Sequence, residues 1–81
     1  MKFIQIGNSL SINVLKIDII SYRNNLIEIY VEEYVYYFSA NQTTYDNIMN
    51  FIDNNNENVL KINTKQIVYS TDRDNSFRKI Q

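Results

Sequence analysis

The chain has 81 residues, a net charge of −1, and neither cysteine nor histidine. This length fits one domain, and the missing thiols and imidazoles exclude disulfides, Cys/His zinc sites and catalysis by Cys or His. Apolar packing must therefore hold the fold, and the thirteen isoleucines favour strands over helices, because β-branched side chains fit a pleated sheet.

Two strands, 2–6 and 10–15, are predicted first, joined by a hairpin turn at Gly7-Asn8-Ser9. The glycine, which is the only one in the chain, adopts positive φ without steric cost. One face of the second strand is apolar and carries Leu10, Ile12 and Val14. Apolar and polar residues alternate here, whereas a signal peptide needs an unbroken apolar run, so we expect a cytoplasmic protein with no membrane span.

The middle of the chain predicts a β-hairpin. A strand over 17–22 and a turn at Arg23-Asn24-Asn25 lead into residues 27–38, IEIYVEEYVYYF. Glutamate disfavours positive φ, so Glu32-Glu33 is a poor tight turn, and we expect the hairpin to close with a longer loop. The alternative is one long strand that bends through a bulge.

Alternation assigns the side chains of this hairpin to two faces. In its first strand the inward face carries Ile27, Ile29 and Val31, and the other face carries Leu26, Glu28 and Tyr30. In its second strand one face carries Tyr34, Tyr36 and Phe38, and the other carries Val35 and Tyr37. Because Tyr36 and Tyr37 point in opposite directions, at least one of them must face water, another subunit or a partner.

One helix is predicted, over residues 43–54. Thr43 would cap its N-terminus, with Asp46 three residues later as a capping-box partner. An apolar stripe at helical spacing would pack on the sheet, and it contains Tyr45, Ile48, Met49 and Ile52.

The remaining chain completes the predicted fold. Residues 58–63 and 65–70 indicate one or two further strands, whereas residues 72–81 have no periodicity and are predicted to be a flexible tail. We therefore predict a single α+β domain over residues 1–71, with an antiparallel sheet of four to six strands and the helix packed on one face.

Charge is distributed unevenly along the chain. Residues 24–60 contain no Lys or Arg and carry −6, whereas residues 1–23 carry +2 and residues 61–81 carry +3. One interpretation is that basic outer strands neutralise an acidic central hairpin. The other is that the hairpin and the helix together present a negative surface that bears tyrosines.

Tyrosine content supports the second interpretation. Five of the seven tyrosines lie between residues 22 and 37, and tyrosine is enriched at interface centres because it gives a large contact area at low entropic cost. We therefore predict a surface that binds a basic patch on another protein. Its residues are Glu28, Tyr30, Glu32, Glu33, Tyr34, Tyr36 and Tyr37.

Composition also suggests an origin and a role. Asn and Ile together supply 26 residues, a bias typical of AT-rich coding in low-GC bacteria and their phages. In size, composition and charge the chain resembles small phage and mobile-element proteins that inhibit host defence, including anti-CRISPR proteins. The resemblance implies an inhibitor that binds its target protein.

We expect no enzymatic activity, no cofactor and no metal. Carboxylates near one another in sequence, such as Glu28, Glu32 and Glu33, are the remaining candidates for acid–base chemistry, but they need a cleft that so small a domain hardly provides.

Two alternative functions remain open. Tyrosines on a sheet can stack on single-stranded nucleic-acid bases, with a basic C-terminal rim of Lys61, Lys65, Arg73, Arg78 and Lys79. Exposed tyrosines can also pair two copies of the chain as a homodimer.

Overall fold

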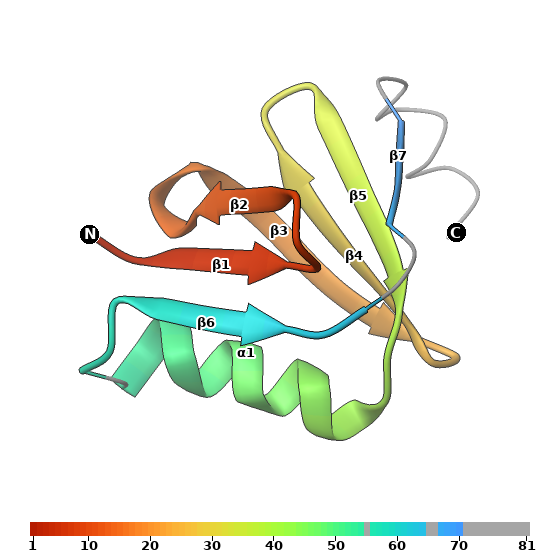
Figure 1. Ribbon diagram of the computed structural model, residues 1–81. Helices are drawn as coiled ribbons and strands as arrows, with labels where there is room; N and C mark the ends of the chain where they lie inside the picture. Colours follow the sequence, from red (N-terminus) through yellow and green to blue (C-terminus); the bar gives the residue numbers. More distant parts are fainter. Residues whose placement is uncertain (55, 65–66, 71–81) are drawn as a thin grey trace.

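The structure, a computed structural model, describes residues 1–54, 56–64 and 67–70 (Figure 1). In chain order its elements are β1 (Phe3–Ile6), β2 (Leu10–Asn13), the 3-10 turn η1 (Val14–Lys16), β3 (Ile17–Arg23), β4 (Leu26–Val31), β5 (Tyr34–Ser39), α1 (Gln42–Asn54), β6 (Val59–Ile62) and β7 (Val68–Ser70). The predicted α+β class is confirmed. Residues 72–81, predicted to form a tail, lie outside the described residues.

The strands form two sheets, where a single sheet was expected. One sheet has the order β2-β1-β6 and the other has the order β3-β4-β5-β7. The chain passes between them at η1, where the Asn13 side chain accepts a hydrogen bond from the Leu15 amide at 3.0 Å and ends the strand. After β5, α1 carries the chain back to the free edge of β1, where β6 pairs in parallel. Alternation cannot reveal such a change of sheet, because both sheets show the same periodicity.

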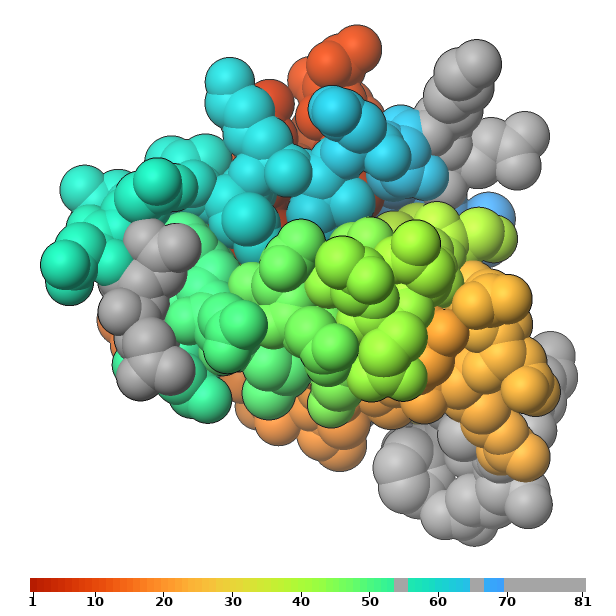
Figure 2. Space-filling view, turned by 90° about the horizontal axis from the view of Figure 1, so that it is seen from below, coloured from red at the N-terminus to blue at the C-terminus, as the bar shows by residue number. Residues whose placement is uncertain are grey.

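The hydrophobic core lies between the two sheets and α1. Its buried residues come from five strands and the helix: Ile4, Ile6, Ile12, Ile27, Ile29, Phe38, Ile48, Phe51 and Ile62. Figure 2, seen from below, shows α1 between β6 and the strands around the β3–β4 turn. The helix therefore closes the core on this side. Among the described residues, no helix combines the length and the apolar character needed to cross a bilayer.

The helix begins earlier than predicted. Asn41 is its cap, because the Asn41 Oδ1 atom accepts a hydrogen bond from the Thr44 amide at 3.0 Å, so the prediction of Thr43 as cap is wrong. Asparagine caps a helix as well as threonine does, and the position is fixed by the reach of its side chain to the third helical amide. The buried face also includes Phe51, which the predicted stripe omitted.

Lys2, which precedes β1, links this part of the chain to the last turns of α1 through hydrogen bonds. Its Nζ donates to the carbonyl oxygen of Phe51 at 2.7 Å and to that of Ile52 at 3.3 Å, and it lies 5.3 Å from the centre of the Phe51 ring. A cation at this end of a helix also offsets the partial negative charge of the unpaired carbonyls.

Candidate protein-binding site

The β4–β5 hairpin sets the register of the candidate site. Val31 lies opposite Tyr34, and Ile29 lies opposite Tyr36. On the other side of β5, Tyr36 lies opposite Tyr69 of β7. Because directly opposed residues share a face of the sheet, this register brings three tyrosine rings together on the same face as the core.

These rings, Tyr34, Tyr36 and Tyr69, are called the tyrosine cluster below. The ring centres of Tyr34 and Tyr36 are 6.2 Å apart and nearly parallel, and Tyr69 lies 6.2 Å from Tyr34 and 6.3 Å from Tyr36 at steeper angles. Such separations are typical of favourable aromatic pairs. Tyr69 is 63% exposed, and the other two rings are half-buried. The cluster therefore presents aromatic surface to solvent near the end of the sheet that carries the β4–β5 turn.

An open pocket of about 460 Å³ adjoins the tyrosine cluster. It is lined by the three rings together with Ser9, Leu10 and Ile67. Phenol and serine hydroxyls supply polar groups, while the ring faces and aliphatic side chains supply apolar walls. Small-molecule sites commonly have volumes in this range, and the pocket is also large enough to receive a side chain of a partner.

The hairpin closes in a two-residue turn, Glu32-Glu33, instead of the longer loop that was expected. Val31 and Tyr34 are the last paired residues, and Glu32 has φ 54°, a left-handed conformation that costs a residue other than glycine roughly 1–2 kcal/mol. The hairpin itself, favoured over one bent strand, is confirmed. Strain of this kind clusters at functional sites, so a glutamate in a position that suits glycine marks the turn as a functional candidate.

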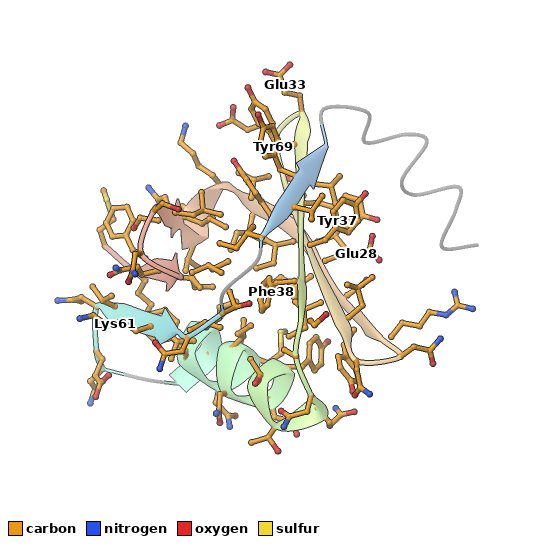
Figure 3. All side chains as sticks on the ribbon, turned by 45° about the vertical axis from the view of Figure 1, so that its right-hand side comes forward. Glu28, Glu33, Tyr37, Phe38, Lys61 and Tyr69 are labelled. Atoms are coloured by element: carbon orange, nitrogen blue, oxygen red, sulfur yellow. The ribbon has the colours of Figure 1, made fainter. Side chains whose placement is uncertain are left out.

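Two glutamates, Glu32 and Glu33, form the turn next to the tyrosine cluster. Figure 3 shows Glu33 at the tip of the hairpin and Tyr69 below it in that view. Glu32 forms an ion pair with Lys16, whose Nζ lies 3.1 Å from its Oε1, and both side chains are about 60% exposed. The pKa of Tyr36 is raised above its ordinary value, mainly by burial and further by Tyr34, Tyr69 and Glu32. The phenol form of Tyr36 is therefore favoured over the phenolate, chiefly because its ring is half-buried.

Two predicted site residues are buried and lie on the opposite face of the sheet. Glu28 is 3% exposed and Tyr30 is 1% exposed, so their assignment to a partner-contacting surface is corrected. The Glu28 carboxylate accepts long hydrogen bonds from the Ser21 hydroxyl (3.4 Å) and the Tyr30 hydroxyl (3.5 Å). Burial raises the pKa of Glu28, and these hydrogen bonds and the charge of Arg23 lower it less.

Tyr37 belongs to this second face as well. It lies opposite Glu28 in the register and is half-buried. In Figure 3, Tyr37 and Glu28 lie on one side of β5 and Phe38 lies on the other. Alternation therefore assigned the side chains to the two faces of the sheet correctly. The face remote from the helix is not exposed throughout, however, because Tyr30 and Val35 on that face are buried.

The acidic residues of the helix are remote from the hairpin turn. In Figures 1 and 3, α1 lies at the opposite end of the molecule from the turn that carries Glu33. The predicted joint negative surface of hairpin and helix is therefore not formed. Of the seven predicted site residues, Glu32, Glu33, Tyr34 and Tyr36 lie at the turn or in the tyrosine cluster next to it.

Sequence reasoning missed Tyr69. It belongs to β7, which pairs with β5 although 28 residues, 40–67, separate the two strands in the chain, and no local sequence pattern predicts that pairing. The one available signal is the run Ile67-Val68-Tyr69. These residue types favour a strand, but they do not indicate which strand it pairs with.

No protein-family model, curated protein or solved structure matches this chain. The function is accordingly argued from the geometry of the site.

Proposed function

We propose that this protein is a non-enzymatic binding module whose tyrosine cluster and Glu32-Glu33 turn together bind a basic patch on a partner protein. One observation carries the proposal: three tyrosines from two strands converge on a pocket beside a strained turn of two glutamates. Rigid aromatic anchors with adjacent charge are what tight protein interfaces use.

Electrostatics supports the same partner class. Exposed carboxylates at the tip of a hairpin steer a basic surface toward the rings and raise the rate of association. Where that basic patch normally holds nucleic acid, the bound module competes with phosphate groups. The resemblance to phage and mobile-element inhibitors supports this inhibitory role in the cytoplasm of a bacterial host.

The proposal can be tested by comparing which partner is captured by the unmodified chain and by two variants whose negative charges are reversed at different places. The chain is used as bait in a lysate of a low-GC bacterium, beside an E32K/E33K bait and a D46K/D53K bait. Asp46 and Asp53 are exposed on α1, so the second variant makes the same change in net charge away from the site. We expect a partner that the chain and D46K/D53K both retain and that E32K/E33K loses. Retention by all three baits would contradict the proposal.

Two further measurements test the alternatives. Exposed rings also suit base stacking, but the carboxylates beside them repel phosphates, so we expect a labelled single-stranded oligonucleotide to bind weakly at low salt. Tight binding that falls steeply with salt would favour the nucleic-acid function instead. Light scattering after gel filtration tests the homodimer, and a dimer disrupted by Tyr69→Ala would assign the cluster to self-association.

A further inference from the structure

We infer that the pocket beside the tyrosine cluster receives the guanidinium group of an arginine side chain of the partner. This inference rests on the proposed function and names the group that the site recognises. It follows from the ring arrangement, from the Glu32 carboxylate and from the ion pair that this carboxylate already makes.

The rings provide the surface on which such a group stacks. Tyr34 and Tyr36 are nearly parallel at 6.2 Å, and Tyr69 adds a third, mostly exposed ring at a steeper angle. A planar guanidinium stacks on an aromatic face and is attracted by its quadrupole. Leu10 and Ile67 complete the lining with apolar side chains, which suit the methylene stem of arginine.

Glu32 provides the counter-charge. It lies in the turn between Val31 and Tyr34, and its carboxylate is the smallest of the causes that raise the pKa of the Tyr36 hydroxyl, after burial, Tyr34 and Tyr69. A guanidinium can donate two hydrogen bonds to a carboxylate while its plane rests on a ring, which an ammonium group cannot do. The site therefore distinguishes arginine from lysine by geometry as well as charge.

The Glu32 carboxylate already forms an ion pair with Lys16 of the same chain. The pair is solvent-exposed, and exposed pairs contribute only about 0–1 kcal/mol, so a better ligand displaces it readily. The Lys16–Glu32 pair thus shows that the carboxylate accepts a cation in this position. An incoming arginine would exchange with Lys16.

A small probe tests the inference without the partner. The chain is titrated with N-acetyl-arginine amide, with N-acetyl-lysine amide and with the citrulline analogue, which has the shape of arginine but no charge, while NMR follows the tyrosine ring signals. We expect Tyr34, Tyr36 and Tyr69 to shift with arginine at ~1 mM affinity. The Tyr22–Tyr45 ring pair, a separate contact, serves as the internal control and should not shift.

Selectivity and variants decide the outcome. Citrulline should bind about tenfold more weakly than arginine, and lysine should fall between them. Tyr69→Leu should weaken arginine binding roughly threefold to tenfold, whereas Tyr69→Phe, which keeps the ring, should restore it. Equal binding of citrulline and arginine, or unchanged binding in Tyr69→Leu, would overturn the inference.

The two proposals fail in different ways. If E32K/E33K still captures the partner, the proposed function fails whatever the probe does. If capture depends on the turn but the arginine probe shows no selectivity, the binding function stands and the arginine assignment falls.

Discussion

The two ends of the β4–β5 hairpin differ sharply although their strands and their alternation are the same. At the end near α1, Ile27 lies opposite Phe38, and both side chains are buried in the core. At the other end, Val31 lies opposite Tyr34, where the ring is half-buried and the adjoining turn is exposed. Alternation decides which face a residue occupies, but the extent of the covering layers decides whether that position is buried. The same strand can therefore stabilise the fold at one end and bind a partner at the other.

The largest expected effect comes from truncating the aromatic residue at each end of β5. Phe38→Ala should destabilise the domain by about 3–5 kcal/mol, because it removes a fully buried ring and leaves a cavity. Tyr34→Ala should cost only about 1 kcal/mol, because its ring is half-buried. Urea denaturation measures both, and equal costs would contradict the division of the hairpin into a core end and a binding end.

Buried and exposed acids extend the comparison to pH. Burial places the folded-state pKa of Glu28 above its ordinary value of 4.5. Its contribution to stability is therefore fully present below that ordinary value and is lost as pH rises through the raised pKa. Glu28→Gln should remove this dependence, so that the free energy of unfolding falls less between about pH 4 and pH 7 than it does in the unmodified chain.

The matched control is Glu33→Gln, which makes the same chemical change at the exposed tip of the hairpin. Urea midpoints measured from about pH 4 to pH 8 provide the readout. A Glu28→Gln profile that parallels that of the unmodified chain would show that Glu28 does not hold its proton on folding.

Relief of backbone strain at the Glu32-Glu33 turn should have a smaller effect on stability, and one of opposite sign, because it stabilises the fold. Glu32→Gly should stabilise the fold by about 1 kcal/mol, because glycine adopts positive φ without penalty, and it should abolish partner capture. At the other end of β4, Asn24 also has positive φ, but asparagine tolerates it, so Asn24→Gly should change stability by only a few tenths of a kcal/mol. Thermal unfolding compares the two, and a destabilised Glu32→Gly would exclude strain at the turn.

The smallest expected effect concerns the ion pair. Lys16→Ala should cost less than about 0.5 kcal/mol of stability, because the pair is exposed to solvent. The same change should strengthen binding of the arginine probe about twofold to threefold, since it removes the Lys16 ammonium group that competes for the Glu32 carboxylate. Weaker probe binding in Lys16→Ala would show that Lys16 helps to build the pocket.

Local patterns predicted the local structure well. The hairpins and the helix follow from alternation, turn residues and the helical spacing of apolar side chains. Alternation also predicted that Tyr36 and Tyr37 point to opposite faces, as Tyr36 contributes to the cluster and Tyr37 lies opposite Glu28.

Long-range pairing was not predictable from those patterns. Tyr69 lies beside Tyr36, and β6 lies beside β1, because of which strands pair after the helix. Hydrophobic periodicity predicts strands but does not predict how distant strands pair. The sequence also did not predict the burial of Glu28, because an acidic residue on a strand is expected to lie on a solvent-exposed face.

The grouping of three tyrosines at one site has a spectroscopic consequence. The chain contains seven tyrosines, four phenylalanines and no tryptophan, so excitation near the tyrosine absorption maximum gives emission from phenol rings. Three of those rings lie within 6.3 Å of one another at the pocket, close enough to exchange excitation energy. We expect occupation of the pocket to change the protein's own fluorescence, so that binding can be followed without attaching any dye.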